Sequence, residues 1–305
     1  MQTQIPGIRI GDEVRRALEA GEPVLALEST ILSHGLPSPR NIEVGIGAET
    51  LVREAGVVPA TIGVIDGVAV VGLSPAEIER LCTSERVVKV SVRDLPIARA
   101  QHLDGGTTVA ATAWLAHRAG IRVMSTGGLG GVHRGASETF DESADLGTLA
   151  TTPITLVSAG VKSILDIGAT LERLETLNIP VVGYRTNRYP GFYIADSGFS
   201  LDYRIESPAD AAVLAHARDE LGLASAVLVA NPVDPANQLD PEFHDRVLAE
   251  ALEAADAAGV TGHDTTPFLL DHVQRATGGQ SLEVNLEVYR GNVALGAEIA
   301  RAVAG

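Results

Sequence analysis

The sequence of 305 residues contains one cysteine and few aromatic residues. Because Cys82 is its one cysteine, disulfide bridges and cysteine-rich zinc sites are excluded. Cys82 shares a helical pattern with Ile78 and Leu81, so we expect a small buried thiol rather than a nucleophile. Aromatic residues are only 4% of the chain, and glycine is abundant. This composition favours a closely packed α/β protein over a β-sandwich or a module that stacks on nucleic-acid bases.

Positive charge is also scarce, since 23 Lys and Arg residues face 39 Asp and Glu residues, for a net charge of −16. This balance predicts weak general binding to nucleic acid and to anionic membranes, so an anionic ligand must be held by a local cluster of donors. The sequence has no run of 18 apolar residues, and its first residues lack the basic and apolar segments of a signal peptide. We therefore expect a cytoplasmic protein that binds neither nucleic acid nor a membrane.

Short β-branched runs alternate along the chain with helical patterns. The expected strands are Val24–Leu27, Thr61–Ile65, Val68–Val71, Val87–Val90, Arg122–Ser125, Ile154–Val157, Val181–Tyr184 and Ala226–Val229. The expected helices are Glu43–Ala55, Pro75–Cys82, Thr108–Ala119, Ser163–Thr176, Pro208–Leu221, Glu242–Ala258, Pro267–Thr277 and Leu282–Ala302. Strands that are apolar on both faces and separated by helices predict an α/β fold, in which helices cover both faces of a mostly parallel or mixed central sheet. We see no linker, so residues 1–305 are expected to form a single domain.

Lysine is rarer still, because 21 of the 23 basic residues are arginine and the two lysines are Lys89 and Lys162. Arginine keeps its proton near neutral pH, whereas a desolvated lysine amine can lose it. A position that requires an amine, as in Schiff-base chemistry, therefore cannot be filled by arginine. Lys89 lies inside the expected strand 87–90, and Lys162 follows the apolar run 154–161 just before an expected helix. Lys162 is a candidate nucleophile, with a strand-edge lysine or an ion pair at a helix start as the alternatives.

A glycine-rich segment, residues 127–135, follows one of the expected strands. Its glycines permit a ligand to approach the backbone closely, and His133 and Arg134 add donors suited to phosphate or hydroxyl groups. The alternative is a tight loop with incidental basic residues. Familiar nucleotide motifs are broken, since Val161 replaces a P-loop glycine and His133 replaces the third glycine of a dinucleotide-binding loop.

Three carboxylates, Asp141, Glu142 and Asp145, follow the glycine-rich segment. Oxygen ligands suit Mn²⁺ or Mg²⁺, which keep several water molecules and need few protein ligands. The alternative is helix capping by Asp141 or Ser143. The histidines show no zinc-binding spacing.

Glu28 ends the apolar strand Val24–Leu27. A carboxylate buried at a strand end has a raised pKa, which suits a general acid, and the alternative is a glutamate bonded to loop amides. Thr107 and Thr108 open an expected helix, where hydroxyls and backbone amides form either a phosphate site or a plain N-cap.

Together these segments resemble the pseudouridine-5′-phosphate glycosidase family over nearly the whole chain. The matching segments are Ala26–Ile31, Ser33–Gly35, Val58–Ile62, Lys89–Ser91, Arg93–Pro96, Thr107–Ala110, Thr126–Gly128, Gly130–Gly135, Phe140–Asp141, Ser143–Leu146, Ala159–Gly160, Lys162–Asp166, Val229–Pro232 and Thr266–Leu270.

The resemblance implies a glycosidase of the lyase type that reversibly cleaves the C–C glycosidic bond of pseudouridine 5′-phosphate to uracil and ribose 5-phosphate. It implies a homotrimer that uses Mn²⁺, or Mg²⁺ or another divalent ion in its place. By the same resemblance, Lys162 is the nucleophile, Glu28 is the proton donor and Asp141 is the metal ligand. The implied substrate-binding and other active-site residues are Lys89, Val109, Ser143, Ala144, Asp145, Thr126, His133 and Asn285.

Two other functions stay open. The first is another Schiff-base enzyme acting on a sugar phosphate, such as an aldolase or a C-glycoside synthase. The second is a non-catalytic sensor of phosphorylated nucleosides, against which the placement of the only two lysines argues. A dehydrogenase is disfavoured because the dinucleotide-binding motif is broken.

Overall fold

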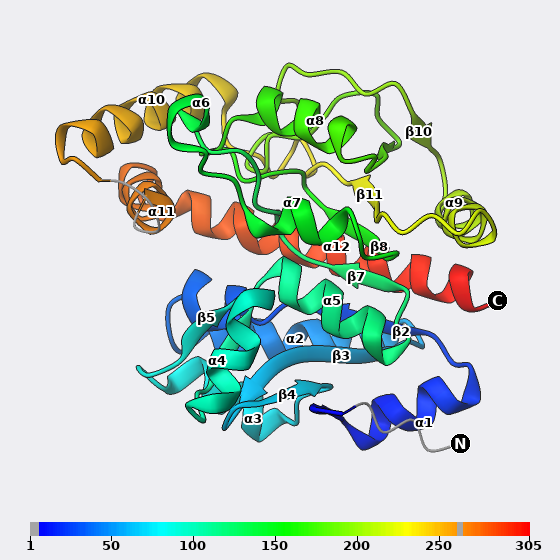
Figure 1. The fold of residues 1–305 in the computed structure, drawn as a ribbon. Helices are drawn as coiled ribbons and strands as arrows, with labels where there is room; N and C mark the ends of the chain where they lie inside the picture. The colour runs from blue at the N-terminus through cyan, green and yellow to red at the C-terminus, as the bar shows by residue number, and fades with distance from the viewer. Residues whose placement is uncertain (1–5, 261–264) are drawn as a thin grey trace.

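The fold is described from a computed structural model, in which residues 6–260 and 265–305 are described. Its strands are β1 (Ile8–Ile10), β2 (Val24–Leu27), β3 (Val58–Ile65), β4 (Val68–Val71), β5 (Val88–Val90), β6 (Gly105–Thr107), β7 (Val123–Ser125), β8 (Thr155–Ser158), β9 (Val181–Tyr184), β10 (Arg204–Ile205) and β11 (Val227–Ala230). Its α-helices are α1 (Asp12–Ala20), α2 (Arg40–Glu54), α3 (Pro75–Thr83), α4 (Leu95–Ala100), α5 (Val109–Ala119), α6 (Ala136–Thr139), α7 (Ala144–Leu149), α8 (Ile167–Thr176), α9 (Pro208–Glu220), α10 (Pro241–Ala257), α11 (Thr265–Ala276) and α12 (Gln280–Ala304). A short π-helix spans Ile31–Gly35 (Figure 1).

The strands form one mixed sheet in the order β1-β4-β3-β2-β7-β8-β11-β9-β10. Strand β6 pairs with β3 and with β5, which lies off this path. The pairs of β3 with β4 and with β6 are antiparallel, and the other strand pairs are parallel. Because β2, β7, β8 and β11 are parallel neighbours, their carboxyl ends lie at one edge of the sheet, where ligands bind in such folds.

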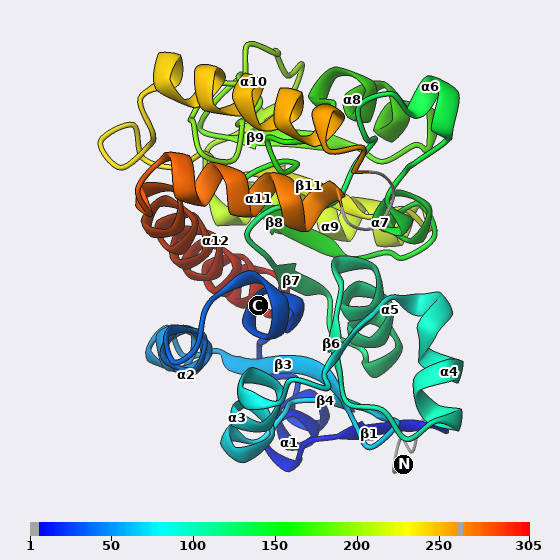
Figure 2. The same cartoon turned by 90° about the vertical axis from the view of Figure 1, so that its left-hand side faces the viewer.

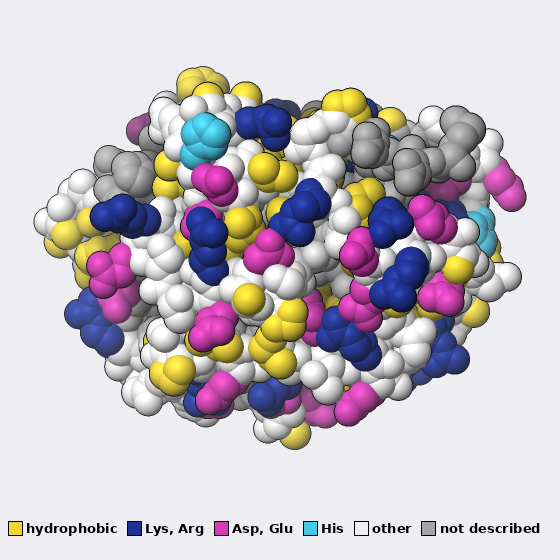
Figure 3. Space-filling model, turned by 90° about the horizontal axis from the view of Figure 1, so that it is seen from below, with side chains coloured by type: hydrophobic (Ala, Val, Ile, Leu, Met, Phe, Trp, Pro, Cys, Tyr) yellow, Lys and Arg dark blue, Asp and Glu magenta, His cyan; other side chains and the backbone are white. Residues whose placement is uncertain are grey.

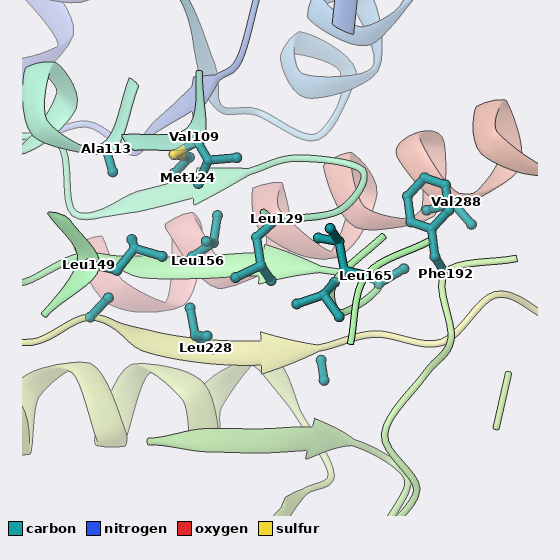
Figure 4. Packing of buried hydrophobic residues seen from close by; sticks show 14 of the residues in the cluster. Val109, Ala113, Met124, Leu129, Leu149, Leu156, Leu165, Phe192, Leu228 and Val288 are labelled. Carbon is teal, nitrogen blue, oxygen red and sulfur yellow. The ribbon is translucent and has the colours of Figure 1, made fainter. Parts of the chain in front are cut away.

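Helices cover both faces of the sheet, as the sequence predicts. Along β2, Val24 and Ala26 belong to a core shared with α5, α7 and α8, whereas Leu25 and Leu27 belong to a second core shared with α2, α3, α9 and α12. Figure 2 shows α2 and α12 to the left of the strands and α4 and α5 to the right. In Figure 4, Phe192 and Val288 of the first core lie beyond the strand arrowheads. The first core therefore extends past the carboxyl ends of the strands.

The eight expected strands are all present, and β3 begins three residues earlier than expected, at Val58. Short elements outside the expected ones are β1, β6, β10, α1, α4, α6 and α7. The expected start of the helix after Lys162 is wrong. The helix predicted from Ser163 begins at Ile167, because the Asp166 carboxylate accepts a hydrogen bond from Ala169 N at 2.9 Å and caps the helix there. Lys162 consequently lies in a loop.

Cys82 is buried, as expected, and burial raises the pKa of its thiol to about 11. The face of the molecule in Figure 3 carries basic (Lys or Arg) and acidic side chains interspersed with small apolar areas. None of the helices in the described part of the chain is long and apolar enough to cross a bilayer. Organisation as a single domain stays a prediction.

Candidate active site at the carboxyl edge of the sheet

Glu28 and Thr126 lie side by side because they follow two paired strands. The parallel pairing of β2 with β7 aligns Leu27 with Ser125, which places the next residue of each strand at the same edge. The Thr126 hydroxyl donates a hydrogen bond to Glu28 Oε2, and both residues are buried. Burial raises the pKa of Glu28, although the Lys162 charge and the Thr126 hydroxyl act to lower it. A buried carboxyl of this kind suits proton donation, and its partner is a hydroxyl rather than the expected alternative, loop amides.

Lys89 lies on β5, which pairs with β6 so that Lys89 is opposite Gly106. Lys89 is exposed to solvent. Partial desolvation by neighbouring groups and the charge of Lys162 lower the pKa of Lys89, whereas Glu28 and Asp145 raise it. The two lysines, Glu28 and Asp145 are therefore close enough to influence one another electrostatically. The prediction that Lys89 occupies a strand is confirmed.

Lys162 lies in the loop between β8 and α8 and is half-buried. Its backbone N–H donates to Leu129 O at 3.2 Å, which ties this loop to the glycine-rich segment. The preceding residue, Val161, donates its N–H to the hydroxyl of the buried Tyr189 at 3.0 Å. These two hydrogen bonds fix the backbone from which the Lys162 side chain extends. An ion pair at a helix start no longer applies, because α8 begins later.

Asp145 joins two parts of the site. Its Oδ1 accepts from Ala110 N at 2.9 Å and its Oδ2 accepts from Gly130 N at 2.8 Å, so one carboxylate binds the first turn of α5 and the glycine-rich loop. A Cβ on Gly130 would collide with the side chain of Ser143, which explains why glycine is required there. Asp145 is buried, and both of its carboxylate oxygens accept hydrogen bonds from backbone N–H groups.

Replacing Asp145 with asparagine is expected to lower the free energy of unfolding by about 1–3 kcal/mol. The amide would present a donor to one of the two N–H groups, leaving that group without an acceptor. Urea unfolding measures the change. The matched control is Glu142→Gln, which removes an exposed 2.8 Å ion pair with Arg173 and should cost less than about 1 kcal/mol. Equal losses in the two variants would contradict the bridging role of Asp145.

The other residues expected to bind substrate differ in accessibility. The side chain of Val109 is 3% exposed and packs in the core, so only its backbone is available to a ligand (Figure 4). Ser143 caps α7 by accepting from Asp145 N at 3.2 Å, as the capping alternative predicts, and Ala144 is exposed. Thr108 likewise caps α5 by accepting from Ala111 N at 3.3 Å.

His133 and Asp141 form a second pair in the loop beyond the glycines. His133 Nδ1 lies 3.8 Å from Asp141 Oδ2, and the two side chains are 19% and 38% exposed. No group of three or more His, Cys, Asp or Glu side chains that could hold a metal occurs within residues 6–260 and 265–305. This donor set fits an ion that keeps most of its water and takes a carboxylate from the protein, as Mg²⁺ and Mn²⁺ can.

Helix α12 packs against β2, β7 and β8 and brings two asparagines next to the start of the glycine-rich loop. The position that a Cβ on Gly127 would occupy is 3.5 Å from Asn285 Oδ1, and that oxygen is buried with no hydrogen-bond partner among the described residues. Two turns further along, Asn292 donates to the carbonyls of Thr126 at 2.8 Å and Gly127 at 3.0 Å. Asn285 was among the residues predicted from the sequence and Asn292 was not, although the spacing of seven residues places both on one face of a helix.

The structure thus brings Glu28, Lys89, Thr126, Asp145 and Lys162 together at one edge, with Asn285 beside them. An amine, a buried carboxyl and a second cation can carry out attack on an electrophilic carbon, proton donation and anion binding. His133 and Asp141 form a separate pair on the segment between the glycines and α7.

Comparisons with known proteins find relatives that match nearly the whole chain. The chain matches the family model described as indigoidine synthase A like protein over residues 13–302. A pseudouridine-5′-phosphate glycosidase of Saccharopolyspora erythraea is 66% identical over 97% of this chain and 98% of its own length. One of Symbiobacterium thermophilum is 50% identical over 95% of this chain and 96% of its own length. The resemblance identified from the sequence is confirmed.

Solved structures share the fold. The prealnumycin C-glycosynthase AlnA in complex with ribulose 5-phosphate has a TM-score of 0.92 and 36% identity, covering 99% of this chain and 98% of its own. An indigoidine synthase A-like protein from Thermotoga maritima has a TM-score of 0.89 and 37% identity over the full length of both chains. These similarities extend from one end of the fold to the other, and the chain therefore belongs to the family of indigoidine synthase A like proteins.

Proposed function

We propose that this protein is an enzyme that reversibly cleaves pseudouridine 5′-phosphate to uracil and ribose 5-phosphate. The observation that carries the proposal is the convergence of an amine, Lys162, and a buried carboxyl, Glu28, at the carboxyl edge of the sheet. The names of relatives up to 66% identical over nearly the whole chain support the same substrate.

The chemistry of the bond explains why a lysine is needed. Ordinary glycosidases use two carboxylates because the leaving atom is a heteroatom with a lone pair that can be protonated. The glycosidic bond of pseudouridine joins two carbons, so the leaving carbon offers no such lone pair. An amine bonded to C1′ supplies a nitrogen lone pair in its place, which can expel the carbon.

In the proposed mechanism, Glu28 protonates the ring oxygen of the ribose while the free amine of Lys162 attacks C1′ and the ring opens. The adduct nitrogen then loses the proton that gave it a positive charge on attack, and its lone pair forms a C=N bond as the C1′–C5 bond breaks, while C5 of uracil takes up a proton. Water hydrolyses the resulting imine, which releases ribose 5-phosphate and regenerates the amine. Lys89 would bind an anionic oxygen of the substrate.

Asp141 is the proposed ligand for Mn²⁺, with Mg²⁺ or another divalent ion as the alternative. Such an ion would supply positive charge for phosphate or hydroxyl oxygens of the substrate. Asp141→Asn is expected to weaken Mn²⁺ binding at least about 10-fold, a loss seen even for groups that only orient a metal ligand. Calorimetric titration with Mn²⁺ alone measures this. The control is Asp202→Asn, which neutralises an exposed aspartate elsewhere in the chain, and unchanged affinity in Asp141→Asn would contradict the assignment.

The resemblance also supports a homotrimer. Sedimentation equilibrium of the purified protein tests the trimer. A mass of one chain would contradict it.

The deciding experiment is incubation of the purified protein with pseudouridine 5′-phosphate and Mn²⁺, followed by chromatography. Release of free uracil and ribose 5-phosphate in equal amounts is expected. An intact substrate that nonetheless binds in calorimetry would support the sensor instead.

A second candidate is a C-glycoside synthase that uses the same lysine. It is favoured by the 36% identity to the C-glycosynthase whose structure holds ribulose 5-phosphate. Incubation of ribose 5-phosphate or ribulose 5-phosphate with uracil and with larger aromatic acceptors distinguishes the two. Preference for uracil supports the glycosidase.

A further inference from the structure

Asn292 lies on α12 and is only 1% exposed, and its side-chain amide faces the end of β7. Both of its N–H groups donate to the backbone, to the carbonyls of Thr126 and Gly127. These two residues are where β7 ends and the glycine-rich loop begins. Asn292 therefore fixes the direction in which the chain leaves the strand.

The amide of Asn292 is itself held in one orientation. Its Oδ1 accepts a hydrogen bond from Asn231 Nδ2 at 3.0 Å, and Asn231 follows β11 at the same edge of the sheet. Asn231 N in turn donates to Ser158 O at 2.8 Å, at the end of β8. If the Asn292 amide turned over, its oxygen would face two carbonyls and its N–H groups would face another donor.

The helix also approaches the strand closely at this point. The Ser125 hydroxyl donates to Asn292 O at 2.8 Å, and a Cβ on Gly296 would collide with that hydroxyl. Because the contact is tight and its polar groups are paired, α12 cannot slide along β7 without breaking several hydrogen bonds.

These bonds form a continuous path from Asn231 through Asn292 to the Thr126 backbone, and from the Thr126 hydroxyl to the Glu28 carboxylate. A shift in the Thr126 backbone would move the hydroxyl away from Glu28. Such a shift costs much at a proton donor, because a misplacement of about 1 Å can lower a rate by about 100-fold.

We propose that Asn292, oriented by Asn231, is a positioning residue that holds Thr126 against Glu28 and so sets the geometry of the proton donor. The inference rests on the proposed function for the role of Glu28 in the reaction. The contact between the side chains does not depend on it.

The test compares Asn292→Ala, Asn231→Ala and Thr126→Val with the unaltered protein, using carbon-13 NMR of labelled glutamate to follow the titration of Glu28. The Glu28 resonance is assigned with Glu28→Gln. Loss of the Thr126 hydrogen bond is expected to move the titration of Glu28 to higher pH in Thr126→Val, and both asparagine variants should shift it in the same direction. Combining Thr126→Val with Asn292→Ala should add no further shift, because both act through one contact.

Turnover provides the second measurement. In the asparagine variants kcat for uracil release should fall about 10- to 100-fold with little change in KM. The matched control is Asn187→Ala, which removes a 3.1 Å hydrogen bond from an asparagine side chain to the Leu201 carbonyl elsewhere. It should leave both kcat and the Glu28 titration unchanged.

An unchanged Glu28 titration in folded Asn292→Ala and Asn231→Ala would overturn the inference, even if both variants melt at lower temperature. If Asn292→Ala does not fold, Asn231→Ala decides, since it removes only the donor that orients the amide. Failure of the unaltered protein to release uracil would overturn the proposed function. The NMR titration would still decide the role of Asn292.

Discussion

The Lys162→Arg variant is expected to lose turnover of pseudouridine 5′-phosphate by at least about 10³-fold while it keeps the fold. Arginine retains the positive charge but has no amine that can form an imine with C1′, so the covalent path is closed. Uracil release measures the rate, and thermal unfolding checks that the fold survives. Borohydride in the presence of ribose 5-phosphate should trap an adduct on Lys162 of the unaltered protein and none on the variant.

The matched control is Lys89→Arg, since Lys89 is the second lysine at the same edge. That variant keeps a cation for the substrate and should still form the borohydride-trapped adduct on Lys162. Appreciable turnover by Lys162→Arg would contradict the nucleophilic role of Lys162 and leave it only an electrostatic role. An adduct on Lys89 would exchange the roles of the two lysines.

Glu28→Gln is expected to lower kcat about 10²- to 10⁴-fold, the usual contribution of a positioned proton donor. Glutamine has nearly the same size and can still accept the Thr126 hydrogen bond, but it has no proton to give. Measuring kcat and KM for uracil release should show the loss mainly in kcat.

The pH profile gives a sharper test of the same residue. Burial raises the pKa of Glu28, so the protonated donor persists to higher pH than an exposed glutamate would, and activity falls as pH rises through that pKa. This basic limb should be absent from Glu28→Gln. A variant that retains the limb at the same pH would assign it to another group.

The sheet and its covering helices could be predicted because apolar runs and helical periodicity depend on neighbouring residues. Strands such as β6, with two glycines in three residues, have no such pattern and gain their geometry from pairing with β3 and β5. The start of α8 was mistaken because apolar Ile164 and Leu165 extend the helical pattern past the cap at Asp166.

Glu28 and Lys162 could be predicted because each is an unusual residue at its position. Glu28 is a carboxylate that follows an apolar strand, and Lys162 is one of two lysines in a chain whose other basic residues are arginine. The bridging role of Asp145 and the role of Asn292 could not be predicted from the sequence. Both bind backbone groups of distant segments, and Asn292 reaches across 166 residues of sequence to the Thr126 carbonyl. Because every residue has a backbone carbonyl, the type of the accepting residue does not reveal that such a hydrogen bond is present.

The pairing of the two lysines at one edge has a practical consequence for anyone handling the protein. An amine-directed reagent has no scattered ε-amino groups to consume it, because the remaining basic side chains are guanidinium groups. Apart from the α-amine at the start of the chain, acylation is therefore confined to the two lysines, and whole-protein mass measurement reports on the edge of the sheet that they share. Shielding by a bound sugar phosphate would appear as missing mass increments, without any digestion of the chain.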